Sequence, residues 1–198
     1  MLGKAELLDA VAASNRGINS DRSDRAVIQA AATVLEDRNP TANPLEATAL
    51  LDGDWRLLYT TSRELLNLDR IPLASLGPIY QSIRLAENRI YNIAEINGPP
   101  LLSGLVSVAA RLEPVSTKRV DVRFERGVLG LRQALGYQSP AQFIQKLRST
   151  PKFSLLQGFD FAINSDRQSG WLEVTYLDED LRIGRGNQGS LFVLKKVM

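Results

Sequence analysis

The stretch YLDEDLRIGRGNQGSLFVLKK, residues 176–196, contains the pattern that decides how the fold is interpreted. Gly184, Gly186 and Gly189 spell G-x-G-x-x-G, which in a dinucleotide-binding loop opens a helix. Here the β-prone residues SLFVLKK follow the last glycine, so the required helix is not predicted. We therefore expect these glycines to be turn residues with positive φ between two short strands, and no nucleotide site is predicted.

From Gly53 onward, apolar and polar residues alternate with a period of two, with one interruption. In residues 54–61, the side chains of Trp55, Leu57 and Tyr59 are expected on one face, as in a half-buried antiparallel strand. Further segments of this kind occupy residues 79–86, 88–96, 105–113, 118–125, 159–164, 171–177, 181–184 and 190–196. Short connections predict a meander of roughly eight strands, closed into an up-and-down β-barrel wide enough for one small ligand.

The first 51 residues are predicted to be mainly helical. Apolar residues recur at helical spacing in residues 7–11 and again in residues 27–35, and Pro44 is suited to open a short third helix. We expect residues 1–51 to form a helical segment packed on the barrel, and residues 52–198 to form the barrel itself. The predicted fold class is mainly β with N-terminal helices.

The interruption of the strand pattern predicts one inserted helix. Ser139 is suited to cap it, Pro140 to begin it and Pro151 to stop it. One interpretation is a lid over a barrel mouth, and the other is contact with a membrane surface. The candidate membrane contacts are Phe143, Ile144, Lys146, Leu147 and Arg148.

Composition argues against much of ordinary enzyme chemistry. The 198 residues include no Cys and no His, which excludes disulfides, thiolate zinc sites, Cys nucleophiles and the commonest general base. The 24 Lys and Arg residues balance 22 Asp and Glu residues and are scattered, so a nucleic-acid partner is not predicted. Asp178, Glu179 and Asp180 are expected in a solvated hairpin turn, with weak calcium binding as the alternative. No catalytic residue, resident metal or cofactor is predicted.

The N-terminal residues carry Glu6 and Asp9 within their apolar stretch, unlike a signal peptide or a transit segment. The longest uncharged run, residues 97–110, contains two prolines and is too short to cross a bilayer. We therefore expect a protein that is soluble, or that sits on a membrane without crossing it.

The expected closure of the barrel concerns one arginine and one tryptophan. Along residues 181–185, Leu181, Ile183 and Arg185 share one face of a strand. If the two aliphatic side chains point inward, Arg185 does so too, and closure places it over Trp55 as a plug. This combination of G-x-W with a late Arg is similar to the lipocalin pattern.

Four stretches carry a more specific likeness: LLDGDWRLLYTTS (50–62), GPIYQSI with YNIAEI behind it, VDVRFE, and YLDEDLRIGRGNQGSLFVLKK. Together they resemble the plastid lipid-associated protein family, also called fibrillins, of chloroplasts and cyanobacteria. The resemblance implies a lipocalin-like barrel at thylakoids or lipid globules that binds isoprenoid or other lipids and supports photoprotection or prenylquinone metabolism. It also implies a closing motif of Gly53, Trp55, Asp178, Leu181, Arg182, Arg185, Gly186 and Phe192, with Tyr59 and Tyr176 beside it.

Without a transit segment, the resemblance points to a cyanobacterial member, in the cytoplasm or peripheral on the thylakoid membrane, whereas a processed plant chain would lie in the plastid. The leading hypothesis is non-enzymatic binding of a carotenoid, prenylquinone, fatty acid or similar lipid. The candidate cavity residues are Trp55, Leu57, Tyr59, Ile83, Val122, Phe124, Tyr176 and Arg185. The alternatives are a protein that docks on a membrane-bound enzyme of prenyl-lipid synthesis, and a bilin-handling chromophore lyase. Hollow and packed barrels fit the same periodicity.

Overall fold

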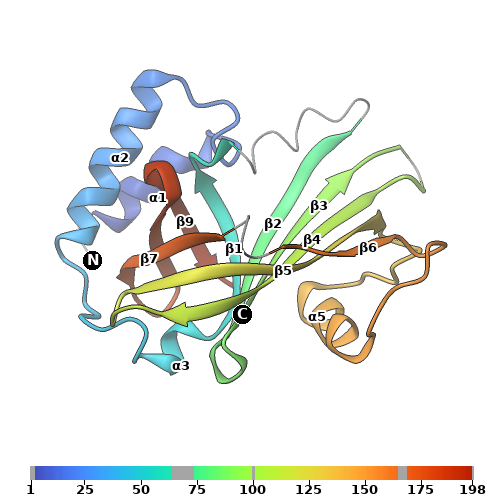
Figure 1. The fold of residues 1–198 in the computed structure, drawn as a ribbon. Helices are drawn as coiled ribbons and strands as arrows, with labels where there is room; N and C mark the ends of the chain where they lie inside the picture. The colour runs from blue at the N-terminus through green and yellow to red at the C-terminus, as the bar shows by residue number, and fades with distance from the viewer. Residues whose placement is uncertain (1–2, 64–73, 100, 165–168, 198) are drawn as a thin grey trace.

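A closed barrel of antiparallel strands forms the centre of the computed structural model, which describes residues 3–63, 74–99, 101–164 and 169–197 (Figure 1). Each barrel strand pairs with the next one along the chain, and the last strand returns to pair with the first. These strands are β1 (Gly53–Thr60), β2 (Ser75–Arg84), β3 (Arg89–Asn97), β4 (Gly104–Pro114), β5 (Arg119–Leu131), β7 (Ser169–Leu177), β8 (Leu181–Gly186) and β9 (Ser190–Lys196). The predicted up-and-down barrel of about eight strands is confirmed.

Strand β5 belongs to the barrel in its first half and leaves it in its second. Residues 119–123 pair with β7, whereas residues 126–129 pair with the additional short strand β6 (Phe159–Ala162). Strand β4 pairs along nearly the whole of β5. The second half of β5, together with β6, therefore extends the sheet beyond the barrel (Figure 1).

The helices in the described residues are α1 (Lys4–Ala12), α2 (Arg22–Glu36), α3 (Thr48–Leu51) and α5 (Pro140–Ser149), with short 3-10 turns η2 (Leu85–Glu87) and η3 (Asn187–Gly189). Helix α2 begins with a capping box in which Asp21 and Asp24 each accept a hydrogen bond from the other's backbone N–H. The third helix starts later than Pro44, because residues 44–46 form a turn. None of the described helices has both the length and the apolar composition that a membrane crossing requires.

Three apolar clusters hold these elements together. The barrel interior contains Trp55, Leu57, Leu76, Ile79, Ile83, Ile90, Ala94, Ala110, Leu112, Val120, Val122, Leu172, Val174, Leu177 and Leu194, joined by Leu51 of α3. Against the outer wall, α1 and α2 pack Leu7, Val11, Ile28, Ala32 and Leu35 onto Tyr59, Tyr176, Leu181, Ile183, Leu191 and Val193. Elsewhere on the outer wall, Phe143, Ile144 and Leu147 of α5 pack with Tyr91, Ile93, Leu105, Ala109 and Val128. Much of the wall is therefore apolar on both faces.

The three glycines of the G-x-G-x-x-G pattern differ in role. Gly189 has a φ of 71° in the turn between β8 and β9, as predicted. Gly184 and Gly186 instead lie within β8, where positive φ is not needed. A side chain on Gly186 would meet the Phe192 ring at 3.0 Å, so this glycine makes room for an inward aromatic ring.

Candidate functional site

The end of the barrel at which β1 begins is closed by α3 and is centred on Trp55, which is fully buried. The indole Nε1 donates a hydrogen bond to the Leu51 carbonyl oxygen, 3.0 Å away. The Arg182 guanidinium lies 5.0 Å from the centre of the Trp55 ring, and the Lys196 ammonium lies 5.3 Å from it. Both cations are attracted by the ring's quadrupole and help to fix the indole at this closed end.

The arginine over Trp55 is therefore Arg182, and the prediction that Arg185 occupies this position is wrong. Arg185 lies on the outer face of β8, where Nε and Nη2 donate to the Glu36 carboxylate of α2 over 2.9 and 2.7 Å. Leu181 and Ile183 share this outer face and pack against the helices. Because α1 and α2 bury the outer face of β8, the aliphatic side chains of this strand do not identify its inner face.

Two β-bulges turn Tyr59 and Tyr176 out of the predicted cavity. The pairing of β1 with β9 shifts between Leu57 and Tyr59, and the pairing of β7 with β8 shifts between Val174 and Tyr176. An extra residue in a strand moves every following side chain to the other face. Both tyrosines consequently pack beneath α1 and α2 on the outer wall.

The other predicted cavity residues do face the interior. Trp55, Leu57, Ile83 and Val122 are buried there, and Phe124 packs against them while staying partly exposed. Phe192 of the predicted closing motif and Val106 of β4 are also partly exposed on this cluster. Phe192 and Val106 stand near the starts of β9 and β4, at the end opposite Trp55, where these interior side chains are partly exposed in the part of the chain that the structure describes; we call it the open end.

A chain of hydrogen bonds crosses the interior from β8 to β3. Arg182 Nη2 donates to Gln81 Oε1, and Gln81 Nε2 donates to Asn92 Oδ1 over 3.0 Å. Gln81 stands opposite Trp55 and Asn92 opposite Gln81, which places both on the inner face. Arg182 stands opposite the inward-facing Leu194. We call Arg182, Gln81 and Asn92 the polar ladder.

Large apolar side chains are exposed where the sheet extends past the open end. Leu129, Leu131, Phe159 and Phe161 belong to β5 and β6, and the adjoining turns contribute Leu101, Leu102, Leu155 and Leu156; we call these eight residues the open-end patch. They are eight of the twelve exposed large hydrophobic side chains in the described residues, so exposed apolar surface is concentrated here.

The strand part of this patch continues the inner face of the barrel. Leu129 stands opposite both Phe159 and Val106, and Val106 packs against the interior cluster. The ring of Phe161 lies over Gly127, where a side chain would meet it at 2.5 Å. An apolar surface therefore runs from the interior, past Val106, onto β6.

The predicted membrane contacts in the inserted helix are all engaged within the protein. Helix α5 begins at Pro140 with Ser139 as its cap, as predicted, but Phe143, Ile144 and Leu147 are buried against the outer wall. Lys146 Nζ donates to the Leu135 carbonyl over 2.8 Å, and Arg148 forms an ion pair with Glu87 over 2.9 Å. The helix thus covers the outside of the wall and not a barrel mouth, which was one of its two predicted positions, and exposed apolar residues follow it between residues 155 and 161.

Comparison with known proteins identifies the family. The family model described as PAP_fibrillin matches residues 1–195. The chain is 35% identical over 216 residues to the chromoplast-specific carotenoid-associated protein of Cucumis sativus, covering 98% of this chain and 67% of the relative. It is 34% identical over 217 residues to the plastid-lipid-associated protein of Citrus unshiu, with the same shares of 98% and 67%. The chain belongs to the PAP/fibrillin family.

A third relative of this PAP/fibrillin protein is the probable plastid-lipid-associated protein 2 of Arabidopsis thaliana, 33% identical over 217 residues, with 98% of this chain and 70% of the relative covered. The predicted resemblance to the family is confirmed. The names of the Citrus and Arabidopsis relatives describe association with plastid lipids, and that of the Cucumis relative describes association with carotenoids.

Sequence reasoning missed two members of the polar ladder in this PAP/fibrillin protein. Gln81 alternates with Ile79 and Ile83, and Asn92 follows Ile90 at the same spacing. A polar residue within an apolar stripe is a recognisable signal, because an inward amide needs a hydrogen-bond partner inside the barrel.

The acidic turn of the PAP/fibrillin chain is tied to the first helix. Asp178 accepts hydrogen bonds from Lys4 Nζ over 2.8 Å, from the Tyr176 hydroxyl over 2.7 Å and from the Leu181 backbone N–H over 2.8 Å, and Lys4 also contacts Asp180. Burial by itself would raise the pKa of Asp178, but these hydrogen bonds outweigh it and lower the pKa to about 2. Asp178 therefore holds the β7–β8 turn and α1 together.

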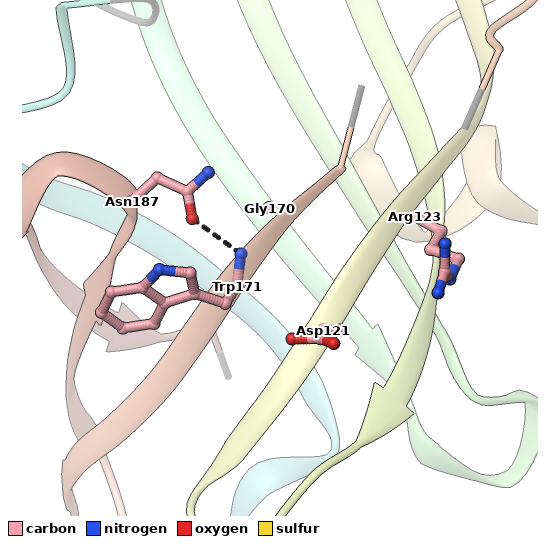
Figure 2. Close-up of a pocket in the computed structure, with 5 residues that line it drawn as sticks. All are labelled: Asp121, Arg123, Gly170, Trp171 and Asn187. Carbon is pink, nitrogen blue, oxygen red and sulfur yellow. Dashed lines mark hydrogen bonds between the residues drawn. The ribbon is translucent and has the colours of Figure 1, made fainter. Parts of the chain in front are cut away.

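A separate hollow of about 240 Å³ lies between β5, β7 and η3 in this PAP/fibrillin protein, as Figure 2 shows. Its lining residues are Asp121, Arg123, Gly170, Trp171 and Asn187. The Asn187 side-chain oxygen accepts a hydrogen bond from the Trp171 backbone N–H over 2.8 Å. Drug-sized ligands occupy pockets of about 300–1,000 Å³ lined mainly by apolar groups, so this small charged hollow fits an apolar lipid poorly.

Proposed function

We propose that this PAP/fibrillin protein is a non-enzymatic lipid-binding protein that takes an isoprenoid or other apolar lipid into its barrel while resting on a lipid surface. The observation that carries the proposal is the continuous apolar surface that joins Phe192 and Val106 at the open end to Phe159 and Phe161 on β6. A lipid chain leaving a membrane could follow this surface inward without crossing water.

The open-end patch supports the surface-binding part of the proposal. Leu155 and Leu156 are 83% and 95% exposed, and Phe159 is 67% exposed. Burying one such side chain in an apolar phase contributes about 1.5–3 kcal/mol, and a cluster of this kind on a soluble protein is typical of a contact surface. The proposed partner is a membrane or lipid-globule surface, in a plastid or on a cyanobacterial thylakoid, with photoprotection or prenyl-lipid metabolism as the setting.

Lipid uptake is tested by titrating the purified protein with a fluorescent polyene and with a prenylquinone analogue. The proposal expects saturation near one ligand per chain for at least one of them. Absence of saturable binding for every apolar ligand would overturn the uptake part.

Surface binding is tested by flotation with liposomes that contain galactolipid and anionic lipid. The double variant Leu155→Glu with Leu156→Glu should float several-fold less than the parent, because two charges would enter the apolar phase. The matched control is Val27→Glu with Val115→Glu, which places the same charges on apolar side chains exposed outside the patch. Equal flotation of the two double variants would contradict the proposal.

A second candidate function, docking on an enzyme of prenyl-lipid synthesis, is favoured by one observation. A hollow of about 340 Å³ lies between α1 and α2 and is lined by Gly3, Glu6, Ala31, Val34 and Arg38. Because α1 and α2 also bury the outer wall, a point change is a better test than deletion. Val34→Asp should abolish co-purification with such an enzyme while lipid uptake persists, and unchanged co-purification would exclude this hollow as the docking site.

A further inference from the structure

The guanidinium of Arg182 is the most deeply buried charge of the barrel interior, with 1% of the residue exposed. Its Nη2 donates to Gln81 and its planar group faces Trp55, but its Nη1 is buried without any hydrogen-bond partner. A buried N–H group of a cation that lacks an acceptor costs free energy of folding. The structure therefore contains an unused donor that points to an acceptor from outside the chain.

Four of the other partly buried arginines in the described residues have carboxylate partners. Arg84, Arg126, Arg132 and Arg185 form ion pairs with Asp54, Asp160, Glu95 and Glu36 respectively. Arg182 is more buried than these and forms no ion pair with any described carboxylate. Burial lowers the pKa of Arg182 to about 9, and no carboxylate in the described part of the chain offsets this desolvation.

The direction of the hydrogen bonds in the polar ladder follows from Arg182. A guanidinium only donates, so Gln81 must turn its oxygen toward it and its amide nitrogen toward Asn92, which accepts with its oxygen. The next free group of the ladder is then the Asn92 amide nitrogen, another donor. Arg182 Nη1 and Asn92 Nδ2 are both donors, so a ligand that binds the ladder must supply an acceptor.

The ladder is also placed where a ligand could reach it. Gln81 and Asn92 are partly exposed although both lie on the inner face. Beyond Asn92, the inner face of β3 continues with Ala94 and Ile96, and the strand rises about 13 Å from Asn92 to Ile96. An apolar chain can lie along this face toward the open end while its head group meets the ladder.

We propose that the polar ladder is the head-group site for the carboxylate of a single-chain lipid, whose tail extends to the open end. This inference rests on the proposed lipid-binding function and names the ligand class of the same site. A carboxylate supplies two acceptor oxygens and the negative charge that Arg182 lacks, whereas a ketone or an ester supplies acceptors only.

The test compares parinaric acid, a fluorescent polyene carboxylate, with its methyl ester on the unmodified protein, at equal concentrations below those at which either aggregates. The acid should bind at least tenfold more tightly than the ester, with saturation near one per chain. Equal affinities would overturn the inference while leaving the proposed function intact. Absence of binding for both lipids, and for the neutral ligands above, would overturn both.

Substitutions in the polar ladder test whether the ladder causes the preference for the acid over the ester. Asn92→Leu and Arg182→Gln should each reduce the acid's affinity more than the ester's, because hydrogen bonds to the charged carboxylate are stronger than those to the neutral ester. Arg185→Gln is the matched control, because Arg185 lies outside the barrel and should leave the preference for the acid unchanged. If Arg182→Gln fails to fold, Asn92→Leu still tests the ladder; an unchanged preference in that variant would contradict the proposed site.

Discussion

The closed end of the barrel buries its largest side chains, whereas the open end leaves large apolar side chains in contact with solvent. Trp55 at the closed end is enclosed, hydrogen-bonded and contacted by two cations. Leu156 and Phe159 at the open end are mostly exposed. The difference indicates that the closed end determines stability and that the open end is available for contacts, so substitutions at the two ends should affect different measurements.

The largest effect on stability is expected at the closed end. Trp55→Ala should lower the free energy of unfolding by about 3–5 kcal/mol, because it removes a fully buried indole and leaves a cavity. Trp171 is the internal control: it is partly exposed on β7, with Arg119 over its ring at 4.4 Å. Denaturant unfolding should show a clearly smaller loss for Trp171→Ala, and equal losses would contradict the contrast.

A smaller loss is expected where α2 is joined to the barrel wall. Arg185→Ala should lower the free energy of unfolding by about 1–3 kcal/mol, since it breaks two charge-assisted hydrogen bonds to the half-buried Glu36. A double-mutant cycle with Glu36→Ala measures the coupling. Strictly additive losses of stability would show that the ion pair between Arg185 and Glu36 does not attach α2 to the wall. Lipid uptake by Arg185→Ala should fall only in proportion to the fraction of unfolded protein.

Acid should weaken the contact between the β7–β8 turn and α1. The folded-state pKa of Asp178 is lowered from 3.8 to about 2, so its contribution to stability is complete above about pH 4 and is lost as the pH falls toward 2. Unfolding measured between pH 6 and pH 2.5 should show a smaller pH dependence for Asp178→Asn than for the parent. Identical pH profiles would show that Lys4 and Tyr176 do not stabilise the ionised carboxylate.

The smallest effect on stability is expected at the open end. Leu155→Glu with Leu156→Glu should change the free energy of unfolding by no more than about 0.5 kcal/mol, because neither side chain is enclosed by the protein. The same denaturant titration as for Trp55→Ala measures it. A loss comparable to that of Trp55→Ala would mean that the patch is part of the core, and the contrast between the ends would fail.

The order of the elements could be predicted from the sequence because each signal is local. Alternation placed the strands, Ser139 and Pro140 placed the start of α5, and the residue pattern at positions 176–196 pointed to the family. The faces of the strands were less predictable. Leu181 and Ile183 pack outward because α1 and α2 cover them, and alternation alone does not say which apolar face lies inside.

The candidate site depends on features that sequence periodicity does not contain. The bulges before Tyr59 and Tyr176 move the side chains that follow them to the opposite face of the strand, and no residue type at those positions predicts a bulge. The pairing of Arg182 with Gln81 joins residues far apart in the chain, so it follows from barrel closure. The exposure of Phe159 and Phe161 likewise depends on β5 changing partners from β7 to β6.

The bulge in β1 has a consequence for ligand size. If β1 paired with β9 without the bulge, Leu58 would stand opposite Val193 and Tyr59 opposite Phe192, so the tyrosine ring would turn inward and occupy space inside the barrel. The same regular pairing would remove Tyr59 from beneath α1 and α2, where it is now buried. A single bulge thus couples the space inside the barrel to the attachment of its helices, so a related chain of this family whose β1 paired regularly through this position would be expected to have both less interior space and a looser helical layer.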